Sequence, residues 1–416
     1  MPARMLLLLA AALAAPAHAA GTAVPPGTGT LARAIASAEP GTTLRLGPGL
    51  YAGPVTIDRS LAIEGVAGTL LEGAGEGSVI TIDAPDVSVE GVTVQGSGSS
   101  HETIDAGIKL TKKARGARVS GNTLLGNLYG IDIHGARDAV VASNAITGRD
   151  DLRMNERGNG IYVWNAPGAE VRDNTIRLGR DGIFVNTSRD NVLSGNRFDD
   201  LRFAIHFMYS NGSEVSGNVS RGNHLGYALM FSSDLIVRGN VSQGDRDHGI
   251  MLNYVNDAVI ADNLVRGGGE KCLFMYNAHK NALRDNRFEG CPIGIHFTAG
   301  SERNVISGNA FVGNRNQVKY VGTSAQEWSE DGRGNYWSDF AGFDLNADGI
   351  ADQAYRPNDL IDNVLWTQPA ASLLLGSPAV QLIRWAQREF PGLLPGGVVD
   401  SAPLMSPAPL AAEVPS

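Results

Sequence analysis

Histidine and methionine side chains recur on short apolar segments in the middle of this 416-residue chain. His206 and Met208 lie two residues apart in one such segment, and Met251 and His296 occupy two later segments. Imidazole nitrogen and thioether sulfur are ligands that suit copper(I). These four residues are therefore candidates for transient copper(I) ligation.

The segments that carry these residues belong to a repeat. An asparagine, usually after Gly or Asp, recurs at intervals of about 22 or 23 residues, with longer intervals of about 30 before Asn174 and about 26 before Asn335. An apolar run of four or five residues follows most of them, too short for a helix. The repeated asparagines are Asn122, Asn144, Asn174, Asn196, Asn218, Asn240, Asn263, Asn286, Asn309 and Asn335. A fixed period of this kind is typical of a solenoid.

Each unit predicts two or three short strands joined by Gly/Asn corners, because asparagine tolerates turns and left-handed backbone. We therefore expect an all-β chain, a right-handed parallel β-helix of about 22–23 residues per coil, with coils roughly 4.8 Å apart. A leucine-rich repeat has a similar period, but its leucine framework is missing. Asparagines stacked at one corner would form a hydrogen-bonded ladder.

Alternation along each strand sends successive side chains to opposite faces. If the second and fourth residues of each run point inward, Met230 and Met275 belong to the core. The outward positions are then Asp132, Tyr162, Phe184, His206, Leu229, Met251, Phe274, His296 and His134, Trp164, Asn186, Met208, Phe231, Asn253, Tyr276, Thr298. Contiguous exposed apolar surface marks a binding site. The predicted partner-contact face comprises Tyr162, Trp164, Phe184, Phe231, Phe274 and Tyr276.

The repeat also limits how the copper candidates can combine. His206 and Met208 would lie roughly 7 Å apart, with Met251 roughly 10 Å away across two coils and His296 near 19 Å across four. All four cannot bind one ion, so a transient site would need a partner's ligand. The alternative is that these residues form a plain contact surface, or core shifted by one position, because a one-residue slip exchanges the faces of a strand.

Carbohydrate chemistry is the competing interpretation of the aromatic face. A polysaccharide lyase, epimerase or hydrolase on this fold would need paired carboxylates. In the two outward columns the one carboxylate is Asp132. A simple sugar-binding module would explain the aromatic residues but not the methionines.

The rest of the chain divides around the repeat. Residues 1–20 have the charged start, apolar run and small-residue cleavage site of a secretory signal, so we expect an exported, soluble protein. Residues 21–120 would form an N-terminal cap and irregular first coils, with a capping helix from Leu31 to Ala38, and 121–335 the regular β-helix. Residues 336–402 would form an extension, and 403–416 a disordered tail. The net charge of −9 argues against nucleic acid as a partner.

The extension has two features of its own. Asp344, Asn346, Asp348 and Asp352 are spaced like calcium ligands around a glycine at the sixth position, but Tyr355 replaces the final glutamate of an EF-hand, so calcium and a plain Asx turn both fit. Ser377-Pro378 starts a helix through Phe390. Its apolar stripe includes Val380, Ile383, Trp385 and Phe390.

Two further features have alternatives that the sequence leaves open. The charged insertion at 149–157, which lengthens one repeat, is either a partner contact or a neutral surface loop. Cys272 and Cys291 lie in neighbouring coils and could form a disulfide, a copper-thiolate site or two buried thiols.

Several runs, most of them outside the general repeat pattern, resemble the NosD family. They are residues 149–160, 179–188, 332–339, 355–360, 377–381 and 396–401. The resemblance implies a periplasmic accessory protein, not an enzyme, for maturation of nitrous oxide reductase in denitrification. It implies work with an ABC transporter (the ATPase NosF and the membrane subunit NosY) and the copper chaperone NosL, hence association with the membrane through the transporter.

From this we expect the region 360–390 to anchor to NosY, and the aromatic, methionine and histidine face to meet NosL or the reductase. Deleting 372–416 should then release the protein from the transporter without unfolding the rod.

Overall fold

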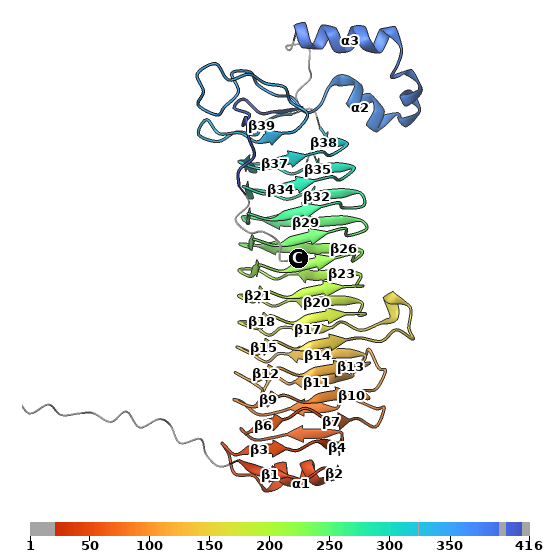
Figure 1. Ribbon diagram of the computed structural model, residues 1–416, viewed down its shortest axis with the longest axis vertical. Helices are drawn as coiled ribbons and strands as arrows, with labels where there is room; N and C mark the ends of the chain where they lie inside the picture. Colours follow the sequence, from red (N-terminus) through yellow and green to blue (C-terminus); the bar gives the residue numbers. More distant parts are fainter. Residues whose placement is uncertain (1–20, 299, 323, 391–396, 410–416) are drawn as a thin grey trace, which may run out of the picture.

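The chain forms a long rod of stacked coils, with helices at its two ends (Figure 1). The computed structural model describes residues 21–298, 300–322, 324–390 and 397–409. Three parallel sheets of 13, 14 and 12 strands run along the rod, and each coil adds one strand to each sheet. The predicted parallel β-helix is confirmed. The predicted signal at 1–20 and the chain from 410 onward lie outside the described residues.

The strands of the three sheets are mostly three to six residues long. The first sheet contains β1 (Thr22–Val24), β3 (Thr43–Leu46), β6 (Ala62–Gly65), β9 (Ser88–Glu90), β12 (Arg118–Ser120), β15 (Val140–Ala142), β18 (Glu170–Arg172), β21 (Val192–Ser194), β24 (Glu214–Ser216), β27 (Ile236–Arg238), β30 (Val259–Ala261), β33 (Ala282–Arg284) and β36 (Val305–Ser307). The second contains β2 (Gly27–Thr28), β4 (Gly49–Ala52), β7 (Thr69–Glu72), β10 (Thr93–Gln95), β13 (Thr123–Leu125), β16 (Ala145–Thr147), β19 (Thr175–Arg177), β22 (Arg197–Asp199), β25 (Val219–Arg221), β28 (Val241–Gln243), β31 (Leu264–Arg266), β34 (Arg287–Glu289), β37 (Ala310–Val312) and β40 (Tyr336–Trp337). The third contains β5 (Val55–Ile57), β8 (Ile80–Ile82), β11 (Ala106–Leu110), β14 (Tyr129–His134), β17 (Ile161–Trp164), β20 (Asp181–Asn186), β23 (Phe203–Met208), β26 (Leu225–Ser233), β29 (His248–Asn256), β32 (Lys271–Tyr276), β35 (Ile293–Thr298) and β38 (Asn316–Val321).

The core is the stack of inward side chains. In the third sheet, Ile183 and Val185 pair in register with Ile205 and Phe207 of the next coil, and all four are fully buried. One coil alone could not cover these faces, so stability is shared between neighbouring coils.

The predicted asparagine ladder is confirmed and runs from Asn122 to Asn335. Each amide nitrogen donates to the side-chain oxygen of the next asparagine at 2.8–3.0 Å. The left-handed backbone falls one residue earlier than the asparagine itself, as at Gly217 (φ 62°) and Asp262 (φ 56°). This explains why glycine or aspartate precedes most of the asparagines.

Each end of the rod is closed. At the N-terminal end, α1 (Thr30–Ser37) buries Leu31 and Ile35, as the helical spacing predicts. At the other end, β41 (Gly397–Val399) returns to pair with β39 (Ala325–Glu327). Asp400 then ends the ladder, because its Oδ2 accepts hydrogen bonds from the Asn335 amide and from Trp337 Nε1, both at 2.7 Å.

This closure corrects two expectations about the C-terminus. The segment expected to be disordered from Pro403 begins as ordered chain, since Leu404 N donates to Asn335 O and Met405 N to Gly349 O. A deletion of 372–416 would also remove Asp400 and β41. Such a deletion would therefore disturb the end of the rod, contrary to the expectation above.

A helical unit stands beyond the last coil (Figure 1). It contains α2 (Leu360–Thr367), a 3₁₀ segment η2 (Pro369–Leu374) and α3 (Pro378–Glu389). Ser377 caps α3 as predicted, accepting a bond from Val380 N. Helix α2 was not predicted, although Asp359 and Asp362 form a capping box that marks its start. Within the described residues, no helix is long and apolar enough to cross a membrane.

Candidate functional site

Three columns of outward side chains cover the third sheet. The middle column contains Asp132, Tyr162, Phe184, His206, Ala228, Met251, Phe274, His296 and Lys319. The third column contains His134, Trp164, Asn186, Met208, Met230, Asn253 and Tyr276. The first column, at the strand starts, includes Asp181, Phe203, Leu225, His248 and Lys271.

The register of β26 differs by one residue from the predicted one. Leu229 is fully buried in the core, whereas Ala228 takes the middle column and Met230 the third. Tyr227 causes the difference, because it occupies the inward place of Ile205 and its hydroxyl donates to Val241 O at 2.8 Å. Met230 is thus an outward residue and not core as predicted, while Met275 is core as predicted.

The predicted aromatic face lies outward, with one change of position. Tyr162, Trp164, Phe184, Phe274 and Tyr276 occupy the middle and third columns. Phe231 lies outside the columns, at a left-handed corner (φ 49°), where its ring stacks on Tyr209 at 5.4 Å and Tyr254 at 5.2 Å.

His206 is held in one orientation by its neighbours. Its ring stacks on Phe184 with centroids 4.4 Å apart, and its Nδ1 lies 3.0 Å from Asp181 Oδ2. Arg202 holds the same carboxylate at 2.7 and 2.8 Å. Burial alone would raise the pKa of Asp181, but hydrogen bonds from His206 and Arg202 together outweigh burial and lower it. In the tautomer of a neutral imidazole that suits this contact, Nδ1 donates to the carboxylate and the lone pair lies on Nε2.

Three methionines surround the same stretch of the sheet. Met208 and Met230 are direct register partners on adjacent coils, and Met251 lies beside Ala228 in the middle column. All three methionine side chains are half-buried. Ala228 is thus the one small residue between His206 and Met251.

His296 lies apart from this group. Four coils separate it from His206, and its column neighbours are Phe274 and Lys319. Burial lowers the pKa of His296 to about 4, with Lys319 and Lys271 adding to the effect. The structure therefore brings His206, Met208 and Met251 onto one patch and leaves His296 outside it.

A pocket of about 510 Å³ opens beside this patch. Its walls include Met154 from the insertion, Phe203, and Met251. The insertion, which projects from the rod in Figure 1, is tied down by His101, whose ring bonds Tyr129 OH and Glu156 O at 3.0 Å.

Near this pocket lies a second group of metal-ligating type, which was not predicted from the sequence: Asp247, His248 and Glu270. His248 Nδ1 lies 2.9 Å from Asp247 Oδ1. The ammonium of Lys271 already lies 3.3 Å from His248 Nε2 and 3.2 Å from Glu270. It therefore supplies the positive charge that a metal ion would bring to this group.

Asp132 is fully buried, with Lys109 Nζ 3.3 Å from its carboxylate. Burial raises the pKa of Asp132 to about 7, and Lys109 opposes this rise. A carboxyl group with no exposed surface cannot reach a polysaccharide on the face of the sheet. This weighs against Asp132 as the acid of a sugar-cleaving site.

The predicted calcium loop is exposed, and its carboxylates bond to the loop itself. Asp344 Oδ2 accepts from Gly349 N and Asp352 Oδ2 from Leu345 N, both at 2.8 Å. Asp348 Oδ1 accepts from Ile350 N at 2.9 Å, and Asn346 bonds Asp348. These bonds are those of an Asx-type turn, and calcium stays a prediction.

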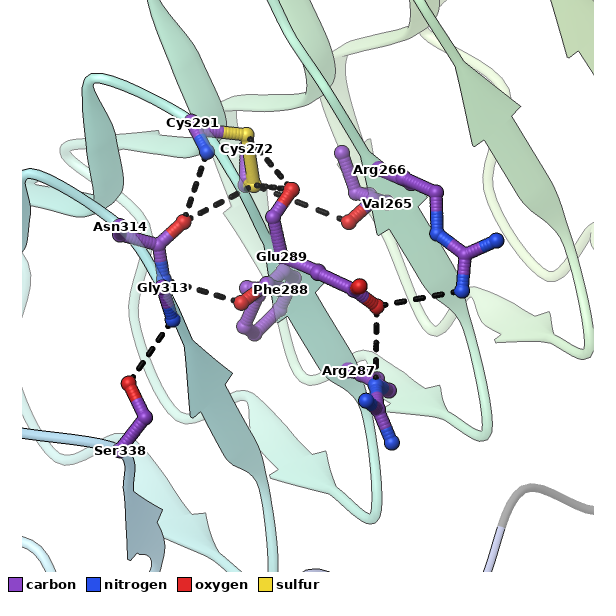
Figure 2. A network of polar contacts seen from close by, with 10 residues as sticks. All are labelled: Val265, Arg266, Cys272, Arg287, Phe288, Glu289, Cys291, Gly313, Asn314 and Ser338. Atoms are coloured by element: carbon purple, nitrogen blue, oxygen red, sulfur yellow. Dashed lines mark hydrogen bonds and ion pairs between the residues drawn. A yellow bond between two sulfur atoms is a disulfide. The ribbon is translucent and has the colours of Figure 1, made fainter.

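Cys272 and Cys291 form a disulfide, with Cα atoms 5.7 Å apart (Figure 2). Asn314 supports this corner, accepting from Cys291 N and donating to Phe288 O, each at 2.9 Å. Of the three alternatives, the disulfide is thus the one observed, and neither sulfur is free to bind copper as a thiolate.

The helices beyond the rod expose apolar side chains. Among the predicted transporter contacts, Ile383, Trp385 and Phe390 are 39, 50 and 58 % exposed. Val380 is buried and so offers no accessible contact. Leu373, which was not predicted, is 89 % exposed.

Comparison with known proteins identifies the family. The family described as periplasmic copper-binding protein (NosD) matches residues 142–342. A "probable ABC transporter binding protein NosD" of Stutzerimonas stutzeri is 41 % identical over 375 residues, which is 87 % of this chain and 86 % of the relative. A protein of the same name from Pseudomonas aeruginosa is 43 % identical over 398 residues, covering 90 % of this chain and 93 % of that protein.

Solved structures share the fold at low sequence identity. A family 28 exopolygalacturonase of Yersinia enterocolitica has a TM-score of 0.59 at 12 % identity, covering 73 % of this chain and 78 % of its own. A PL6 family polysaccharide lyase of Pseudopedobacter saltans has a TM-score of 0.55 at 14 % identity, covering 70 and 84 %. At this distance the likeness concerns the fold alone. The two relatives, similar over most of their length, place this chain in the NosD family of periplasmic copper-binding proteins.

Proposed function

We propose that this protein handles copper(I) in the periplasm as an accessory protein for the maturation of nitrous oxide reductase. The observation that carries the proposal is the position of the soft ligands. His206 and three methionines lie on the outer side of the third sheet and not among its inward core side chains, and the three methionines are partly exposed. The family's description as copper-binding supports the metal.

The partners in this proposal are those of an ABC transporter system. The exposed apolar side chains of α3 and η2 anchor the protein to the membrane subunit NosY, and through it to the ATPase NosF. The relatives' name as ABC transporter binding proteins supports this arrangement. The aromatic and methionine face of the third sheet meets the copper chaperone NosL and then the reductase.

The role proposed is binding and delivery without catalysis. The polysaccharide-active alternative would need accessible paired carboxylates, whereas Asp132 is fully buried beside Lys109. The relatives are named as binding proteins, which supports the same choice.

Copper(I) binding by the purified mature protein tests the central claim, with a chromophoric chelator as competitor and with or without NosL. Competition by the protein alone, or by the protein and NosL together, supports the proposal. Copper left with the chelator in both cases contradicts it.

Transporter docking needs a test that spares the end of the rod. Trp385→Ser combined with Phe390→Ser removes exposed apolar surface but keeps β41 and Asp400. We expect this variant to lose co-purification with NosY while its thermal unfolding stays unchanged. Exposed Leu345 (83 %), changed to Ser, is the matched control, because it lies outside the helical unit. Undiminished co-purification of the double variant would contradict the docking proposal.

A further inference from the structure

We propose that His206 Nε2 and the thioethers of Met208, Met230 and Met251 form one copper(I) site, built across three coils of the third sheet. Asp181 acts as its positioning residue. This inference rests on the proposed function and names the ligands of the copper site. Compared with the residues predicted from the sequence, the ligand set excludes His296 and adds Met230. It replaces the idea that a partner must complete the ligand set.

The strongest support is the state of His206. The residue is 7 % exposed, and its Nε2 is buried with no hydrogen-bond partner among the described residues. A buried polar atom without a partner costs free energy, so its presence calls for an explanation such as a bound ion. Its other nitrogen bonds Asp181, which is the arrangement that fixes a metal-ligating histidine in one tautomer and raises its basicity.

The register of the sheet brings three thioethers to the same patch. Met208 lies in the same strand as His206, and Met230 is its register partner one coil on. Met251 lies two coils from His206, but the residue between them is Ala228. Because a coil adds about 4.8 Å, the Cα atoms of His206 and Met251 are roughly 10 Å apart, a gap that two long side chains can close over a methyl group.

The ligand types favour copper(I) over harder ions. The group combines one imidazole with thioethers, which are soft ligands. The carboxylate that contacts His206, that of Asp181, is already paired with Arg202. The nearby group of Asp247, His248 and Glu270 is the contrasting case, with oxygen ligands and the Lys271 ammonium already in place.

Met251 also gives the site an opening. It lines the pocket of about 510 Å³ together with Met154 and Phe203. Met251 is the one proposed ligand among the residues that line this pocket, and His206 lies one small residue further along the column.

The test is copper(I) binding by the full mature protein, read by competition and by X-ray absorption at the copper edge. The variants are His206→Ala, Met208→Leu, Met230→Leu and Met251→Leu, because leucine keeps the volume of methionine and removes only the sulfur. We expect each to weaken copper(I) binding at least tenfold. The wild-type spectrum should show one nitrogen and three sulfur ligands, and His206→Ala should lose the nitrogen.

His296→Ala and Met405→Leu are the matched controls and should bind copper(I) as the wild type does. If the wild type binds copper(I) and the four variants bind it equally well, the site is wrong and the proposed function stands. If the wild type binds none, alone or with NosL, both are wrong. A spectrum with only nitrogen and oxygen ligands would also overturn the site.

The role of Asp181 needs a readout that a structural effect would not produce. Long-range nitrogen–proton NMR reports which imidazole nitrogen carries the proton. We expect His206 to be protonated on Nδ1 in the wild type, and Asp181→Asn to lose this preference and weaken copper(I) binding by about 10- to 100-fold. An Nε2-protonated imidazole in the wild type would contradict the positioning role.

Discussion

The asparagine corner and the outer face of the third sheet are built on the same coils, yet they differ in whether the same residue type recurs from one coil to the next. At the corner, the same residue makes the same bonds from Asn122 to Asn335. In the middle column of the outer face, neighbouring coils place different side chains at the equivalent position, as with Phe184, His206, Ala228 and Met251.

The difference separates the residues that stabilise the rod from the residues that the rod exposes for binding. A residue that recurs in every coil satisfies the backbone groups of that coil, so its loss should affect stability. A side chain that does not recur at the equivalent position of the neighbouring coils is not required by the repeat. Its loss should affect binding. The predictions below test this division.

The largest effect should follow Asn218→Ala. Asn218 Nδ2 donates to Leu193 O at 2.9 Å and Asn240 Oδ1 at 3.0 Å, and its oxygen accepts from Asn196 at 3.0 Å. Removal leaves several buried groups unpaired, at a cost of about 1–3 kcal/mol for each group. We expect about 4 kcal/mol lost in urea unfolding, with copper(I) binding unchanged under native conditions. A loss below 1 kcal/mol would break the division.

A smaller and pH-dependent effect should follow Asp245→Asn. Burial raises the pKa of Asp245 to about 6, even though Ser242, Ser220 and the Asn223 amide donate to it. The native state therefore takes up a proton that the unfolded state binds only near pH 4. Wild-type stability should rise as pH falls from about 6 toward 4 and be lowest above pH 6.

Asparagine at this position should remove that pH dependence and stabilise the protein by at most ~3 kcal/mol at pH 8. The neighbouring Asn223 shows that this corner accepts an amide, since its Nδ2 donates to Ser220 and to Phe198 O. The measurement is urea unfolding at pH 5 and pH 8. Equal pH dependence in variant and wild type would contradict the assignment.

Ala228→Leu tests the outer face without removing any ligand. The larger side chain would stand between His206 and Met251 and keep them apart. We expect copper(I) binding to weaken about tenfold, or 1.4 kcal/mol, with thermal unfolding measured alongside. Unchanged copper(I) affinity in a folded variant would show that the two residues do not share an ion.

The smallest effect should follow Asn253→Ala, the control for Asn218. Asn253 lies in the third column, half-buried, and its Oδ1 has no hydrogen-bond partner among the described residues. We expect its loss to change stability by less than about 0.5 kcal/mol. A larger loss of unfolding free energy would mean that asparagine stabilises this rod outside the ladder as well as within it.

The sequence was sufficient for the coil, the ladder and the capping helix at Leu31, because each follows from a period or a local pattern. It was also sufficient to place His206 and Met208 on one face. The error at Met230 was avoidable, since Tyr227 lies one repeat of about 22 residues after Ile205 and so takes its inward place.

The pairing of His206 with Asp181 could not be predicted from alternation. Asp181 is two residues before the inward Ile183, so a regular strand would place it in the core. Asp181 is instead the first residue of β20, and its carboxylate bonds Arg202 and His206 of the next coil. Likewise, Asp400 accepts a hydrogen bond from the backbone amide of Asn335, 65 residues away in the sequence. No local sequence pattern predicts that the chain returns to this place.

The constant spacing of the strands in the third sheet fixes the position of each outer-face residue along the rod in multiples of one coil. From β23, which carries His206, to β38 at the end of the sheet, the chain advances five coils, roughly 24 Å at about 4.8 Å each. The height of any outer-face residue above the terminal helices can therefore change only in whole steps. Insertion or loss of one coil would shift every group beyond it by one step and leave the rest of the face intact.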